Sequence, residues 1–152
     1  MNALPAASAL DVMRTDVLSL NPNATMGEAV TTLAEYGVHG APVVDAVGAL
    51  VGVLTLTDVV RRDSVREENE QNEARGWASL AGLDDEFVRD WMTDKVTTVG
   101  QQADLKDLCG LMSKEQIHRV FVVDQGRLTG VVSALDVVGF LAENSNLQRV
   151  SE

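Results

Sequence analysis

Gly52–Val60 reads GVLTLTDVV, and 78 positions later Gly130–Val138 reads GVVSALDVV. Both stretches begin with a glycine and an apolar run, and both end in Thr/Ser-x-x-Asp-Val-Val. The preceding triplet VVD also recurs, at residues 43–45 and again 79 positions later at residues 122–124. One residue has therefore been lost in the turn between the two motifs. A period this long is not that of a solenoid, and it indicates two copies of one supersecondary unit.

Each copy is predicted to fold in the order strand, helix, strand, strand, helix. The chain is therefore expected to be an α/β (α+β) protein with two small sheets packed together and helices outside. Short β-rich runs, residues 17–20 and 96–99, open the copies. Thr25 and Glu28 have the spacing of a capping box, and Asp104 is the predicted N-cap of the equivalent helix. The apolar stripes of these helices are Met26, Ala29, Val30, Leu33 and Ala34 in the first copy, and Leu105, Leu108, Cys109 and Met112 in the second.

The remaining elements of each copy surround the repeated stretch. Two strands joined by a short Gly-containing turn are predicted at residues 41–44 and 50–54, and again at residues 120–123 and 128–132. A closing helix is predicted from Thr57 to about Arg62 and from Leu135 to about Glu143. Each copy is small for independent stability, so packing the two sheets together would bury both apolar faces.

Residues 62–90 separate the two copies. Their acidic part, residues 66–73, is predicted to be a solvated helix extension or a loop, and Trp77 either covers an edge or contacts a partner. Asp84 is predicted to cap a short helix that buries Phe87, Val88 and Trp91. The resulting domains are a first repeat with its N-terminal helix at residues 1–65, a linker at residues 66–84, and a second repeat with its preceding short helix at residues 85–152.

Composition and charge exclude several classes of protein. Hydrophobic residues make up 45% of the 152 residues, as in globular proteins, and 12 basic against 23 acidic side chains give a net charge of −11. This charge argues against binding to nucleic acid or to an anionic membrane surface, and we interpret it as a source of solubility. The lone cysteine, Cys109, excludes an internal disulfide framework and is expected to pack as a small apolar residue in a reducing, cytoplasmic compartment. Neither a secretory signal nor a membrane span is predicted.

The recurring pattern resembles the CBS domain, the module named after cystathionine β-synthase. The motifs that carry the resemblance are the Val-Met pair at Val12 and its counterpart Trp91-Met92, a capped helix, His-x-x-x-Val-Val-Asp from His39 and from His118, and the repeated stretch. The resemblance covers about residues 12–61 and 91–143. It implies a pair of repeats that forms one pseudo-symmetric module and commonly dimerises. Many such modules bind adenosine nucleotides, others bind S-adenosylmethionine, and they regulate an enzyme, channel or transporter.

The strand-to-helix junctions are the candidate ligand sites that this resemblance implies. Asp58 and Asp136 would accept hydrogen bonds from the two ribose hydroxyls, since a carboxylate has two acceptor oxygens for two donors. Thr55, Thr57 and Ser133 would donate to phosphate, beside the free N–H groups of a helix start. The alternative is purely structural, because Thr-x-x-Asp and Ser-x-x-Asp also cap helices.

The other predicted contacts differ between the copies. His39 is followed by Gly40, whereas His118 is followed by Arg119, which suits phosphate, so the two sites are expected to be unequal. A bulky Phe121 replaces Pro42 of the first copy, and it would narrow the cleft or stack on a base. The apolar adenine slot implied by the resemblance consists of Val17, Leu18, Ala41, Pro42, Val96, Thr97 and Val120.

The resemblance implies a regulatory, energy-sensing module, and an enzyme is not expected because no nucleophile–base pair, metal-ligand spacing or P-loop is present. It would bind AMP, ADP or ATP between the repeats and act in trans on an enzyme or transporter, as a homodimer, with no required cofactor. Because the protein is acidic, AMP or ADP is expected to bind better than ATP unless Mg²⁺ accompanies the triphosphate. The alternative is a ligand-free dimeric interaction scaffold.

Overall fold

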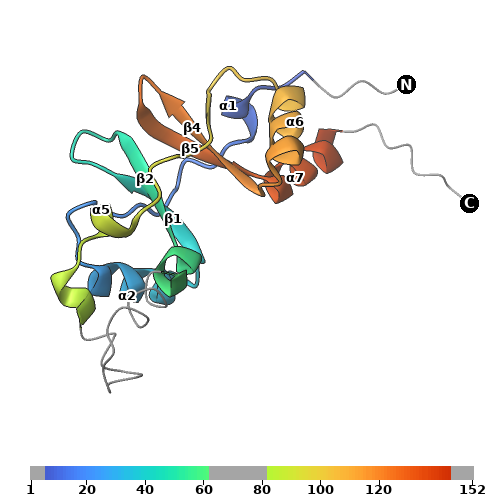
Figure 1. The fold of residues 1–152 in the computed structure, drawn as a ribbon. Helices are drawn as coiled ribbons and strands as arrows, with labels where there is room; N and C mark the ends of the chain where they lie inside the picture. The colour runs from blue at the N-terminus through green and yellow to red at the C-terminus, as the bar shows by residue number, and fades with distance from the viewer. Residues whose placement is uncertain (1–5, 62–81, 145–152) are drawn as a thin grey trace, which may run out of the picture. The chain divides into compact units, whose positions relative to one another are not determined.

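The computed structural model describes residues 6–61 and 82–144, which fall into two compact units. Unit 1 combines Met1–Val17 with Thr97–Glu152, and unit 2 consists of Leu18–Val96. Each unit holds one small sheet with helices beside it (Figure 1). The predicted fold class is therefore confirmed.

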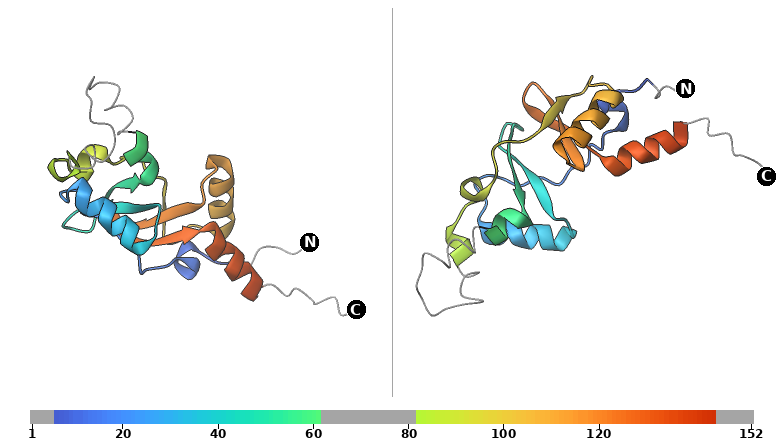
Figure 2. Two further views of the ribbon diagram at one scale, coloured as in Figure 1. Left: turned by 90° about the horizontal axis from the view of Figure 1, so that it is seen from below. Right: turned by 45° about the vertical axis from the view of Figure 1, so that its right-hand side comes forward.

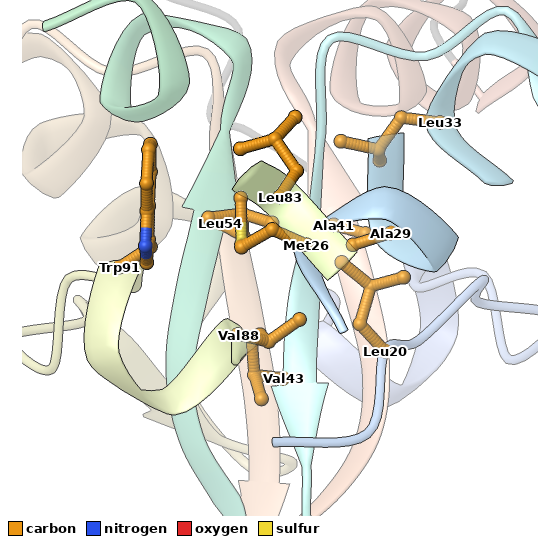
Figure 3. Packing of buried hydrophobic residues seen from close by; sticks show 10 residues of the cluster. All are labelled: Leu20, Met26, Ala29, Leu33, Ala41, Val43, Leu54, Leu83, Val88 and Trp91. Carbon is orange, nitrogen blue, oxygen red and sulfur yellow. The ribbon is translucent and has the colours of Figure 1, made fainter. Parts of the chain in front are cut away.

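Unit 2 is built on the antiparallel pair β1 (Gly40–Val44) and β2 (Leu50–Thr55). Helix α2 (Met26–Tyr36) and helical residues 56–61 flank the sheet, and the 3₁₀ helix η1 (Gly82–Asp85) and helix α5 (Val88–Trp91) complete the unit. Figure 3 shows the apolar core that these elements share, which consists of Leu20, Met26, Ala29, Leu33, Ala41, Val43, Leu54, Leu83, Val88 and Trp91.

Unit 1 repeats this plan with a three-stranded sheet. Strand β4 (Arg119–Asp124) lies between β3 (Thr98–Gly100), which is parallel to it, and β5 (Arg127–Ser133), which is antiparallel. Helices α1 (Ala9–Val12), α6 (Leu105–Glu115) and α7 (Ala134–Asn144) pack beside the sheet (Figure 2). The buried core consists of Ala9, Leu105, Leu108, Met112, Val120, Val122, Val132 and Val137.

The short helix that precedes each repeat packs in the unit formed by the other repeat. Helix α1 is fastened to the start of α6 by hydrogen bonds from Ala9 N to Ala103 O at 2.8 Å and from Leu105 N to Ala7 O at 2.9 Å. The equivalent bonds in unit 2 run from Val88 N to Ala24 O at 3.0 Å and from Met26 N to Glu86 O at 2.8 Å. The predicted domains follow the sequence repeats, with the N-terminal helix in residues 1–65 and the later short helix in residues 85–152, whereas the compact units group each short helix with the other repeat.

The two hairpin turns account for the lost residue. Two residues, Gln125 and Gly126, with φ of 52° and 80°, lie between the paired Asp124 and Arg127, whereas three residues, 46–48, lie between the hydrogen-bonded Asp45 and Ala49 of the first copy. The longer turn is closed by Asp45, whose Oδ1 accepts from Val47 N at 3.0 Å and Ala49 N at 2.9 Å. These side-chain bonds, together with Gly48 at a φ of 86°, shape the longer turn, whereas two consecutive left-handed residues form the turn of the second copy.

Several local predictions need correction. Residues 17–20 form no strand; only Leu20 pairs, through an isolated parallel bridge to Val43. Ala34 is exposed rather than part of the buried stripe of α2. Asp84 lies inside η1, and Phe87 is the N-cap of α5. The acidic segment 66–73 and Trp77 lie outside the described residues.

Candidate functional site

At the end of β2, Thr55 and Asp58 bond to each other in both directions. Oδ2 of Asp58 accepts from Thr55 N and Thr55 Oγ1, both at 3.0 Å, and Thr55 Oγ1 accepts from Asp58 N at 3.2 Å. This reciprocal arrangement is a capping box that fixes the start of the helix at residues 56–61. It also holds the carboxylate in one orientation, with Oδ1 turned away from the cap.

Ser133 and Asp136 repeat this geometry at the end of β5. Oδ2 of Asp136 accepts from Ser133 N at 2.9 Å, and Ser133 Oγ accepts from Asp136 N at 3.0 Å. The structural interpretation of the two Thr/Ser-x-x-Asp motifs, which the sequence left as an alternative, is therefore correct for Oδ2. It leaves the role of the second carboxylate oxygen to be explained.

The second oxygen of each carboxylate contacts a residue that closely follows a short helix packed in the other repeat's unit. We call each short helix with the two residues after it, 9–14 or 88–93, an exchanged segment. Thr93 Oγ1 donates to Asp58 Oδ1 at 3.2 Å, and Arg14 Nε donates to Asp136 Oδ1 at 2.8 Å. Each segment is held against the sheet by two backbone hydrogen bonds of 2.9 Å, between Thr93 and Val53 and between Arg14 and Val131. Each junction thus combines a capping hydroxyl, a carboxylate and one side chain from the exchanged segment.

The carboxylate of Asp136 is kept ionised by its surroundings. Burial acts to raise its pKa, but the Ser133 N–H, the Ser133 side chain and the nearby Arg14 guanidinium together outweigh burial and lower the pKa below its ordinary value of 3.8. The Asp136 side chain is only 8% exposed, whereas that of Arg14 is 68% exposed. One partner of this ion pair is therefore fixed, and the other is largely in solvent.

Two glycines allow the exchanged segments to approach the sheet. A Cβ atom on Gly130 would lie 2.6 Å from Met13 Sδ and 2.9 Å from Arg14 O. A Cβ atom on Gly52 would lie at the same distances from Met92 Sδ and Thr93 O. The first residue of each repeated stretch is therefore a glycine because the segment that carries Thr93 or Arg14 passes directly over it.

The predicted histidines lie beside the junctions. The carbonyl of His39 accepts from Leu56 N and that of His118 accepts from Ala134 N, both at 2.8 Å. Both side chains are exposed, as are Thr57 and Arg119. Arg119 is paired with Ser133 across the strands, so a single edge of unit 1 gathers His118, Arg119, Ser133, Asp136 and Arg14.

The residues predicted for the adenine slot divide into three groups. Ala41 and Val120 point into the cores of their own units, where they are 2% and 0% exposed, so only their backbone could face a ligand. Pro42 is also buried, and because it follows Ala41 on β1 its side chain points to the opposite face of the sheet. Phe121 has the same relation to Val120 on β4. Val17, Leu18, Val96 and Thr97 are half-buried and lie at the two points where the chain passes from one unit to the other.

Within residues 6–61 and 82–144, no cluster of three or more His, Cys, Asp or Glu side chains is arranged to hold a metal ion. No helix in these two ranges is both long and apolar enough to cross a bilayer.

Comparison with known proteins identifies the repeated unit. A family model described as the CBS domain matches residues 9–64 and again residues 88–143. The chain belongs to the CBS-domain family. The predicted resemblance is thus confirmed, and in sequence each CBS domain begins at the short helix that packs in the other unit.

Similar proteins share this tandem arrangement to different extents. Uncharacterized protein MJ1225 of Methanocaldococcus jannaschii is 30% identical over 134 residues, which are 88% of this chain and 42% of that protein. The CBS domain-containing protein YhcV of Bacillus subtilis is 29% identical over 131 residues, 86% of this chain and 83% of YhcV. The chain therefore spans less than half of the first relative and most of the second.

Among solved structures, CBSX2 in complex with AMP is similar with a TM-score of 0.72. The likeness covers 90% of this chain and 96% of CBSX2, at 24% sequence identity. At this identity the likeness supports the CBS-pair fold.

Thr93 and Arg14 were absent from the predicted site. The signal that could have found them is the same repeat offset, because the pairs Met13-Arg14 and Met92-Thr93 lie 79 positions apart. Their contacts depend on the exchange of the short helices, which a reading of contiguous repeats does not anticipate.

Proposed function

We propose that this protein is a regulatory module that binds an adenosine nucleotide at its strand-to-helix junctions and signals to a partner protein in trans. The observation that carries the proposal is that the two oxygens of each carboxylate have different partners. Oδ2 of Asp58 and of Asp136 caps a helix, while Oδ1 contacts a side chain from the exchanged segment. A ribose hydroxyl can replace that contact without disturbing the cap.

The chemistry of the junction suits a ribose. Oδ1, the carboxylate oxygen that the cap does not use, is an acceptor with two lone pairs, and ribose hydroxyls are donors. The lowered pKa of Asp136 keeps it in the accepting form near neutral pH. The likeness of the fold to CBSX2, which was solved in complex with AMP, adds support for an adenosine nucleotide as the ligand.

Regulation in trans and dimerisation belong to the same proposal. A ligand can affect a partner only if the partner's affinity differs between the free and bound states. Leu135 and Val138, one turn apart on α7, are 73% and 60% exposed, and so offer apolar surface for a second copy. Light scattering measures the mass of the purified protein in solution, and a monomeric mass at micromolar concentration would contradict the homodimer.

The binding proposal is tested with Asp136→Asn and Asp58→Asn, titrated with AMP in a calorimeter. Each substitution keeps the shape of the side chain and removes its charge, so each should weaken binding at its own junction by about 10-fold or more. Asp107→Asn is the matched control, because Asp107 is an exposed residue in the first turn of α6 and loses the same charge. If wild-type protein binds none of the adenosine nucleotides, the scaffold alternative replaces this proposal.

A further inference from the structure

The two junctions are built alike but carry different charges. Arg14 and Thr93 are equivalent residues of the repeat, and both donate to Oδ1 of an aspartate. Arg119 and Gly40 are also equivalent, and each is paired with the capping residue of the neighbouring strand. The Asp136 junction therefore has two arginines where the Asp58 junction has a threonine and a glycine.

We propose that Arg14 makes the Asp136 junction selective for phosphorylated nucleosides, whereas the Asp58 junction has no such requirement. This inference rests on the proposed function, because it names the class of ligand that one of the two junctions accepts. It assigns Arg14 as a specificity-determining residue, which neither the repeat motif nor the predicted site contained.

The bond geometry at Asp136 explains the requirement for phosphate. Arg14 Nε donates to Oδ1, the oxygen that a ribose hydroxyl would use. A hydroxyl that binds Oδ1 competes with the guanidinium for this oxygen, and the guanidinium has room to move away because the Arg14 side chain is 68% exposed. Within the described residues, the bond from Nε to Asp136 is the one hydrogen bond or ion pair that the Arg14 side chain makes.

The displaced guanidinium then needs an anion. A neutral nucleoside offers none, so its binding would exchange an ion pair for a hydroxyl–carboxylate bond and gain little. A nucleotide brings a phosphate, which a planar guanidinium can bind through two parallel hydrogen bonds. The exposed Arg119 beside Ser133 strengthens the preference in the same direction.

The Asp58 junction lacks this coupling. Thr93 is neutral, so displacing its 3.2 Å hydrogen bond leaves no charge to be compensated. Gly40 adds no cation from the neighbouring strand, and a Cβ atom there would lie 2.9 Å from Leu54 O. A ribose could therefore bind this junction with or without a phosphate.

The test compares AMP with adenosine on the full chain and on Arg14→Thr, which copies the residue of the other junction. The dissociation constant of adenosine divided by that of AMP should fall by about 10-fold in Arg14→Thr, because AMP binds more weakly at the Asp136 junction. Arg127→Thr is the control, because Arg127 is an exposed arginine on β5 of the same unit and loses the same charge. If Arg14→Thr does not fold, Arg14→Gln removes the charge while keeping most of the length.

Each outcome is informative. A fall in the ratio confined to the Arg14 variant supports the inference. An unchanged ratio, or an equal fall in Arg127→Thr, overturns the inference and leaves nucleotide binding intact. If the wild-type chain binds neither compound, the proposed function fails and this inference fails with it.

Discussion

Replacing Gly130 by alanine should destabilise the protein, because the new methyl group would collide with the segment that carries Arg14 of the candidate site. The new Cβ would lie 2.6 Å from Met13 Sδ and 2.9 Å from Arg14 O, and Arg14 is held in place by two 2.9 Å backbone bonds to Val131. Overpacking of this kind costs about 1–3 kcal/mol, and loss of one of the backbone bonds adds about 1 kcal/mol. We expect the free energy of unfolding to fall by about 2–4 kcal/mol.

Gly110→Ala provides the matched control because it is the same chemical change in open space. Gly110 lies in α6, and a Cβ there meets no atom within 4 Å. Alanine favours the helix over glycine by about 0.5–1 kcal/mol, so this variant should be more stable than the wild type. Urea unfolding followed by circular dichroism measures both. If Gly130→Ala were as stable as Gly110→Ala, the close approach of the Arg14 segment would be refuted.

Three further predictions follow from the exchanged segment, the ionised carboxylate and the net charge. Trp91 is 5% exposed in the core of unit 2, so Trp91→Ala should lower the free energy of unfolding, measured in urea, by about 3–5 kcal/mol. A loss below about 1 kcal/mol would contradict the place of Trp91 in that core. Because the folded protein lowers the pKa of Asp136 from 3.8, the stability from its carboxylate is present above that value and is lost as the pH falls through the folded pKa. The stability difference between wild type and Asp136→Asn should therefore shrink from about pH 6 to about pH 3, and a constant difference would argue against an ionised, stabilising carboxylate. Calorimetry without metal should show tighter binding of AMP than of ATP because the chain carries a net charge of −11; the reverse order would contradict the electrostatic argument.

The fold could be predicted from the sequence because its signals are local and occur twice. The apolar strands around Val43 and Val122 and the capped helix that starts at Met26 each depend on residues close in the chain. Finding the same signals again after 79 positions made the two-unit architecture secure. The single missing residue was also placed correctly, in the hairpin turn at Gln125 and Gly126.

What the sequence did not reveal is the exchange of the short helices. Helices α1 and α5 have four residues each, too few to show a periodic pattern, and their partners lie far away in the chain. For the same reason Arg14 and Thr93 were overlooked, although both bond directly to predicted site residues. The sequence also did not give side-chain direction: Ala41 and Val120, which belong to the predicted adenine slot, point into the cores of their own units.

The central claim is that Asp58 and Asp136 use their second oxygen to bind a ribose. The most direct measurement is a calorimetric comparison of AMP with 2′-deoxy-AMP on the wild-type chain. We predict that AMP binds about 10-fold or more tightly, because the deoxy compound lacks one hydrogen bond to a charged carboxylate. Equal affinities for the two nucleotides would contradict the claim.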